Sequence, residues 1–183
     1  GVVAAPITEW KAMLGTVRAV RDVWLEVERS WTQLESIFLA SEDIREQLPE
    51  DAKRFDGIDS AFREQMADAC QNNNPIEVCM ASGRLEVSET NFTALELCQK
   101  SLSDYLEVKK KKFPRFYFIS PTDLVDILSK GRFPPAVQEH FAKFTDNTGK
   151  IDWQKDADGK PTGTALGCQA TDGEKFPYLE PFV

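Results

Sequence analysis

Apolar residues between Trp10 and Phe38 recur every seven residues in two series. This is the spacing of a helix whose narrow apolar seam faces another helix. Tryptophan is frequent in the first series, and it fits poorly into the regular holes of a two-stranded coiled coil, so a bundle of unlike helices is expected. The first series is Trp10, Val17, Trp24, Trp31 and Phe38, and the second is Met13, Val20, Val27 and Leu34.

Further helix starts and stops follow this first segment. Ser41 precedes two acids and suits an N-cap, and the dipeptide Leu48-Pro49 interrupts the pattern. Residues 72–75 form a loop, and a short helix after it can end at Gly83. A long helix then runs from about Leu85 into four lysines at positions 109–112, which either stabilise the helix end through its dipole or form a binding patch. We therefore expect residues 1–112 to be one helical bundle.

Residues 113–149 are expected to be a strand-helix-helix junction. Pro114 cannot continue the long helix, and the run from Arg115 to Ile119 is rich in aromatic and β-branched residues, which predicts a short buried strand. Ser120 is then placed as the N-cap of a helix that ends near Gly131. Phe133 and two prolines open a last helix, with Val137, Phe141 and Phe144 facing inward.

Residues 150–183 are predicted to form a β-hairpin region. Asp158-Gly159 and Asp172-Gly173 are turn dipeptides between three short runs suited to strands. One or two exposed hairpins are expected rather than a full sheet, and the region looks truncated at Val183. A calcium loop around Asp156 is disfavoured because position twelve of such a loop would be Ala165 instead of glutamate.

Composition limits the class of protein. The chain has 183 residues, of which 42% are hydrophobic, enough for one domain or two small lobes. Its net charge of −8 argues against nucleic acid as a partner. No apolar run has the length of a membrane span, and no signal peptide is visible at Gly1. The lack of an initiating methionine suggests a fragment of a longer protein.

No motif in the chain predicts a catalytic, cofactor-binding or metal site. Cys70, Cys79, Cys98 and Cys168 have no C-x-x-C spacing, and buried free thiols are favoured over disulfides. His140 is the single histidine and lacks a Ser, Cys or second His at motif spacing. The residues alone therefore predict a mainly α, elongated helical bundle that serves as a structural or interaction module.

Several multi-residue motifs, in order and at similar spacing, resemble the linker region of a dynein heavy chain. The likeness extends from about Trp10 to Asn147, and the sequence of residues 41–51 is more similar to axonemal than to cytoplasmic dyneins. The motifs are Trp24 to Val27, Trp31 to Phe38, Ser41 to Pro49, Arg54 to Asp59, Cys98 to Leu102, Tyr105 to Glu107, Phe113 to Phe118 and Asp126 to Ser129.

This resemblance implies a mechanical role. In dynein heavy chains the linker lies N-terminal to the AAA+ motor ring, binds no cofactor itself, and swings across the ring to move the motor along a microtubule. It also implies a location in the cytoplasm and the axoneme of a cilium or flagellum, with the ring of the same chain as partner and no membrane contact.

Two groups of residues become site candidates through this resemblance. The first is a structural joint made of Phe113, Pro114, Arg115, Phe116, Tyr117 and Phe118. The second is a ring-contact hairpin made of Lys155, Asp156, Asp158, Gly159 and Lys160, although residues 152–171 depart from the usual pattern. Two other functions stay open: a spectrin-like adaptor that binds a protein partner, and an enzyme whose site is assembled from unmarked carboxylates.

Overall fold

The computed structural model describes residues 4–72, 74–131 and 133–182. The chain divides into two compact units, one ending at Ser103 and the other beginning at Asp104. The fold is mainly α with a small antiparallel sheet, as the sequence predicted. Among the described residues, no helix combines the length and apolar character needed to cross a membrane.

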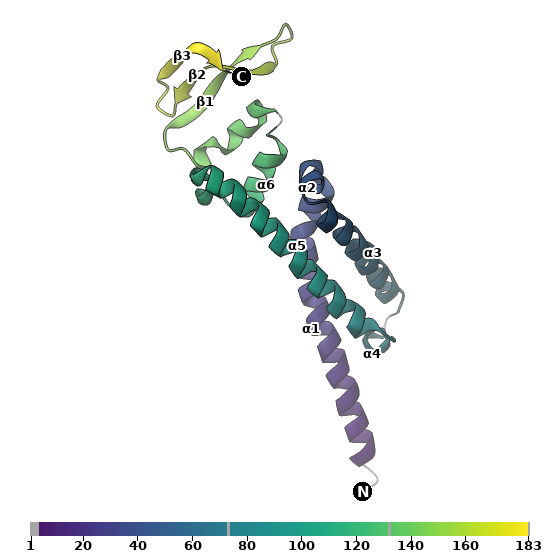
Figure 1. Ribbon diagram of the computed structural model, residues 1–183. Helices are drawn as coiled ribbons and strands as arrows, with labels where there is room; N and C mark the ends of the chain where they lie inside the picture. Colours follow the sequence, from purple (N-terminus) through teal and green to yellow (C-terminus); the bar gives the residue numbers. More distant parts are fainter. Residues whose placement is uncertain (1–3, 73, 132, 183) are drawn as a thin grey trace. The chain divides into compact units, whose positions relative to one another are not determined.

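The first unit consists of helices. They are α1 (Ala4–Ala40), α2 (Glu42–Gln47), α3 (Pro49–Gln71), α4 (Pro75–Met80) and the first part of α5 (Arg84–Lys112). Short α2 and α4 lie at opposite ends of α3 (Figure 1). The predicted boundaries are confirmed, because the Ser41 hydroxyl accepts a hydrogen bond from Ile44 N at 3.3 Å and Pro49 opens α3.

The seam of α1 is buried from its middle to its C-terminal end. Val20, Val27, Leu34 and Phe38 are at most 2% exposed, as their spacing predicted. Trp10 is 53% exposed, so the expected burial is wrong at the N-terminal end of the seam. That end of α1 extends beyond the other described helices of its unit (Figure 1), and Ile7 and Leu14 are exposed there as well.

Aromatic pairs join α1 to α3. The rings of Phe38 and Phe55 stack with their centroids 5.3 Å apart, and those of Trp31 and Phe62 lie 5.0 Å apart. The Trp31 indole also donates to Asp59 Oδ1 at 2.9 Å. Trp31 therefore packs its apolar ring against Phe62 while its indole N–H binds the carboxylate of Asp59.

Helix α5 completes the core of this unit through buried residues. Leu95 and Cys98 have no exposed surface. At the start of α5, the guanidinium of Arg84 lies 5.4 Å from the centre of the Trp24 ring, donates to Val78 O at 3.2 Å, and pairs with Asp68. The four cysteines are free, and Cys79 and Cys98 are buried while Cys70 is exposed.

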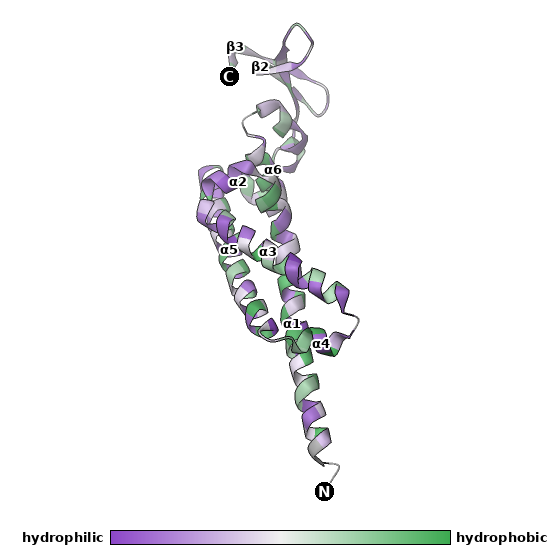
Figure 2. Ribbon diagram, turned by 90° about the vertical axis from the view of Figure 1, so that its right-hand side faces the viewer, coloured by the Kyte–Doolittle hydropathy of each residue, from purple (hydrophilic) through white to green (hydrophobic). Residues whose placement is uncertain are grey.

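The second unit begins with the end of α5 and three short helices. These are the 3₁₀ helix η1 (Pro114–Phe118), α6 (Pro121–Ser129) and the 3₁₀ helix η2 (Pro134–Lys143). The predicted buried strand at residues 115–119 is wrong, because η1 is a 3₁₀ helix with no buried residue. Its backbone closes local bonds, such as Phe116 N to Phe113 O at 2.9 Å, instead of pairing with a strand. Helix α6 is one of the most apolar segments of this unit (Figure 2).

The unit ends in a three-stranded antiparallel sheet of order β1-β2-β3. The strands are β1 (Thr148–Lys155), β2 (Pro161–Ala170) and β3 (Lys175–Phe182). They are longer than predicted, and two hairpins share β2, so the expected hairpins form one three-stranded sheet. Gly167 allows close pairing of β2 and β3, because a Cβ there would lie 2.7 Å from Phe176 O. The predicted truncation at Val183 lies outside the described residues.

Candidate functional site

Tyr117 ties η1 back to the last turns of α5. Its hydroxyl donates to Glu107 Oε1 at 2.6 Å, and the Lys110 ammonium lies 5.7 Å from the centre of its ring. The carboxylate of Glu107 raises the pKa of Tyr117, because it favours the protonated hydroxyl that donates to it. Lys109 likewise lies 5.0 Å from the ring centre of Tyr105. Two of the four lysines are thus engaged with aromatic faces on their own unit.

A cluster of four phenylalanines joins η1 to η2. Phe113 and Phe116 contact each other edge to face at 4.8 Å, and both contact Phe144, at 6.2 and 6.1 Å. Phe141 meets Phe144 at 5.7 Å. Such edge-to-face pairs each add about 0.5–1.5 kcal/mol beyond the area that they bury. We call Phe113, Phe116, Phe141 and Phe144 the aromatic junction.

The remaining candidate joint residues behave differently from one another. Arg115 reinforces the aromatic junction, since its Nη1 donates to Phe144 O at 3.2 Å. Pro114 opens η1. Phe118 is 79% exposed and has no part in the aromatic junction. The structure therefore brings most of the predicted joint together but leaves Phe118 at the surface.

Ion pairs connect α6 to η2. Lys143 Nζ lies 2.8 Å from Asp123 Oδ1, and Asp123 also accepts from Ser120 Oγ at 2.8 Å. The ammonium of Lys143 is the main cause of the lowered pKa of Asp123. The Ser120 hydroxyl accepts from Asp123 N at 3.2 Å, which confirms the predicted N-cap of α6.

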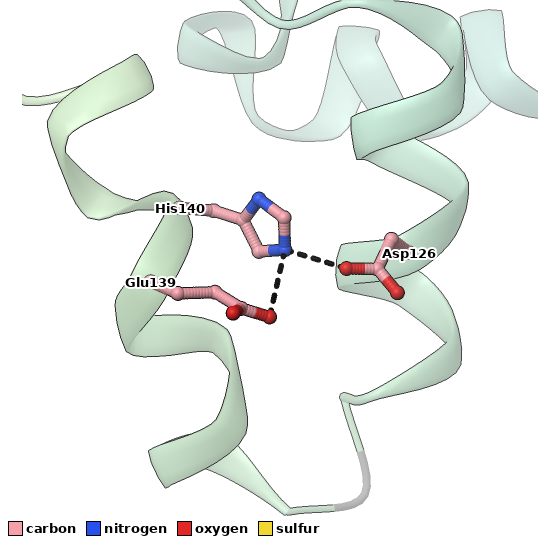
Figure 3. A group of neighbouring side chains, drawn as sticks. All are labelled: Asp126, Glu139 and His140. Atoms are coloured by element: carbon pink, nitrogen blue, oxygen red, sulfur yellow. Dashed lines mark hydrogen bonds and ion pairs between the residues drawn. The ribbon is translucent and has the colours of Figure 1, made fainter.

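Asp126, Glu139 and His140 form a group whose potential ligand atoms lie within 4.8 Å of one another (Figure 3). His140 is 5% exposed, and its Nε2 lies 2.7 Å from Asp126 Oδ2 and 3.4 Å from Glu139 Oε1. A buried imidazole with two carboxylates is a donor set that zinc accepts.

The surroundings of this group favour a hydrogen-bonded ion-pair network. Lys130 Nζ lies 2.8 Å from Asp126 Oδ2 and 2.5 Å from Glu139 Oε1, so an ammonium already neutralises the oxygens that would bind a metal. It is the main cause of the lowered pKa of Asp126. The other ring nitrogen of His140 points away from the carboxylates and has no partner within the described chain, whereas a metal-bound histidine almost always has one there (Figure 3).

Gln138 joins η2 to the sheet. Its Oε1 accepts two hydrogen bonds, from Ile151 N at 2.9 Å and from the indole Nε1 of Trp153 at 3.1 Å. The sequence did not single out Gln138, because a lone glutamine between apolar positions has no pattern of its own. Its role depends on where β1 lies in the fold.

The β1–β2 turn holds the candidate ring-contact residues at an exposed tip. Asp156 Oδ1 accepts from Asp158 N at 3.0 Å and from Lys160 N at 2.8 Å, and Gly159 has a positive φ of 79°. The predicted turn is confirmed. Lys155 and Lys160 flank it with exposed side chains. The carboxylate of Asp156 is engaged with backbone donors in this turn.

Comparison with known proteins identifies the family. Residues 2–183 match the family described as dynein heavy chain, N-terminal region 2. The chain belongs to the dynein heavy chain family. It is 47% identical over 175 residues to human dynein axonemal heavy chain 9, and 44% identical over 174 residues to the dynein beta chain, flagellar outer arm, of Chlamydomonas reinhardtii.

These dynein matches cover 96% and 95% of the present chain but 4% of each relative. A ciliary dynein beta chain of Heliocidaris crassispina is 45% identical over 172 residues, again 94% of this chain and 4% of the relative. The similarity to axonemal, ciliary and flagellar heavy chains agrees with the resemblance seen in the sequence. It extends through the C-terminal sheet, beyond Asn147.

Proposed function

We propose that this dynein heavy chain segment is a mechanical linker in an axonemal motor. It transmits the ATP-driven conformational change of the AAA+ ring of the same heavy chain to produce movement along a microtubule in a cilium or flagellum. ATP is bound and hydrolysed by the ring, and this segment supplies no catalytic group or cofactor site.

The aromatic junction is the observation that carries the proposal. A lever needs a connection that keeps its angle under force, and close-packed side chains resist compression. The second unit has a continuous series of contacts: Tyr117 joins α5 to η1, the aromatic junction joins η1 to η2, and Gln138 joins η2 to β1. A displacement at one end of this series is passed on through packed rings and hydrogen bonds.

The exposed β1–β2 tip is where we propose that the unit meets the ring. Lys155 and Lys160 are exposed there, and the turn is held by Asp156, so the tip has a defined shape and two exposed cations. These features suit a small polar contact that forms and breaks during a cycle, since exposed ion pairs contribute only about 0–1 kcal/mol each.

The test is a pair of alanine substitutions in the motor heavy chain. Phe116→Ala removes a ring with two edge-to-face partners, and we expect it to lower microtubule gliding velocity more than basal ATPase rate. Phe118→Ala is the matched control, because this ring is 79% exposed and two residues away. It should leave both rates unchanged.

A second candidate function follows from the charge distribution. Residues 1–103 contain eighteen acidic and ten basic residues and thus hold the whole net charge of −8. If the segment is an adaptor that binds a basic protein through residues 1–103, reversing acidic charges there should abolish partner binding. Phe116→Ala should then reduce gliding velocity and ATPase rate equally, or change neither. That outcome would reject the lever.

A further inference from the structure

One side of the C-terminal sheet is incompletely covered. Helix η2 packs mainly on β1 and to a lesser extent on β2. A helix is about 10 Å wide and neighbouring strands lie about 4.8 Å apart, so a single helix covers about two strands. All eight residues of β3 are exposed, including Phe182 at 73%. The third strand therefore has an apolar surface that no described helix or strand covers.

A groove marks this uncovered region. It has a volume of about 520 Å³, and η2 forms one wall while the sheet provides the rest. Glu180 is the single charged residue in its lining, so the groove suits an apolar occupant. Its main apolar lining residues are Pro134, Phe141, Ile151, Trp153, Tyr178 and Phe182.

We propose that this groove binds an amphipathic helix from a part of the same heavy chain outside residues 1–183. The helix lies on the β3 side of the sheet, next to η2, and inserts apolar side chains between Phe141 and Phe182. It completes the second layer over the sheet. This proposal rests on family membership and does not require that the segment act as a lever.

A helix is favoured over a fourth strand because the open edge of β3 is missing one backbone donor, at Pro177. Ala170 N donates to Glu174 O at 2.8 Å, so the backbone groups of Glu174 face β2. In an antiparallel ladder the backbone groups of successive residues face alternate sides. The register is unbroken from Lys175 to Pro177, so Pro177 faces the open edge, where it offers no N–H. A helix satisfies its own backbone and needs no donor from the edge.

The same heavy chain is favoured as the source because most of such a chain lies elsewhere. The segment matches 4% of the length of human dynein axonemal heavy chain 9. The groove is lined by Tyr178, Glu180 and Phe182, the last residues that the structure describes. Chain that follows β3 in a longer protein leaves directly from the rim of the groove, so its local concentration there is high.

Site-specific photocrosslinking in the intact heavy chain, within its native dynein assembly, tests the proposal. The photoreactive residue p-benzoylphenylalanine replaces Phe182, which is exposed enough to accept it without loss of the fold. Mass spectrometry should identify a crosslinked peptide of the same chain from outside residues 1–183. The peptide should have apolar residues at helical spacing.

Leu179 provides the matched control. It is fully exposed on the same strand, and the alternation of side chains places it on the face opposite Tyr178 and Glu180. The photoreactive residue at this position should capture the helix several-fold less often. As a second readout, Phe182→Asp should speed hydrogen exchange in the captured peptide, and Leu179→Asp should not.

Three results would overturn the proposal. One is capture of residues 1–183 of a second copy, which would make the groove a dimer contact. Another is capture of a different polypeptide. The last is equal capture from positions 182 and 179, or capture from neither, which would show that no helix is held specifically in the groove.

Discussion

Gln138 offers a direct test of how the second unit holds its sheet. The substitution Gln138→Met keeps the length of the side chain and removes the oxygen that accepts from Ile151 N and from the Trp153 indole. Both donors are part-buried. A hydrogen bond of this kind contributes about 0.5–1.5 kcal/mol net, so losing two should lower the free energy of unfolding of this unit by about 1–3 kcal/mol.

Urea unfolding followed by NMR of ¹⁵N-labelled indole groups gives the measurement. The indole N–H signal of Trp153 reports the second unit, whereas Trp24 and Trp31 lie in the first. The Trp153 signal should move toward the position of a solvent-exposed indole, and its unfolding midpoint should fall while those of Trp24 and Trp31 stay fixed.

The matched control is Gln169→Met. Gln169 donates to Gly173 O at 3.2 Å at an exposed turn of the same sheet. Water can replace that bond, so the cost should be below about 0.5 kcal/mol. An equal loss for both substitutions would refute the reasoning, because it would mean that Gln138 does no more than an exposed glutamine does.

Three further predictions use the same free-energy measurements or simple chemistry. Gly57→Ala should stabilise α3 by up to about 1 kcal/mol, since a Cβ there meets nothing within 4 Å. Gly167→Ala should destabilise the sheet by about 1–3 kcal/mol, because its Cβ would meet the backbone of β3. A stabilising Gly167→Ala and a destabilising Gly57→Ala would contradict this reasoning. Lys130 lowers the pKa of Asp126 below 3.8, so the stabilisation from this carboxylate is present above that pH and disappears as pH falls through the folded pKa. Asp126→Asn should therefore reduce the fall in unfolding free energy between neutral and acidic pH. An unchanged fall would exclude the Asp126–Lys130 pair as its source. Burial raises the pKa of the Cys98 thiol, so this thiol should resist alkylation by iodoacetamide at neutral pH until the protein unfolds. Rapid labelling of Cys98 in the folded chain would contradict this and show that the first unit opens locally.

The helical part of the chain was largely predictable because helices obey local rules. Ser41, Asn74 and Ser120 each accept a backbone N–H at a helix start. The seven-residue spacing likewise identified the buried side of α1 from Val20 to Phe38. Capping and periodicity depend on residues within a few positions of one another, so the sequence contains the needed information.

The local structure of the candidate joint was not predictable from the sequence. The aromatic run at residues 115–119 predicted a buried strand, because such residues are enriched in strands. That preference reflects packing against a neighbouring strand, and none pairs with this run in the structure. The rings of Phe113 and Phe116 pack instead on Phe144, which lies about 30 residues later and also meets Phe141.

The sequence by itself determined the family of this protein, its mainly helical class, most of its α-helix boundaries and its tight turns. Tertiary structure decided which aromatic rings meet, that Phe118 is exposed, that Gln138 accepts from β1, and that the described residues of β3 are all exposed. The division has a physical reason. Local structure follows from backbone sterics and neighbouring side chains, whereas burial and long-range contacts depend on which segments the whole chain brings together.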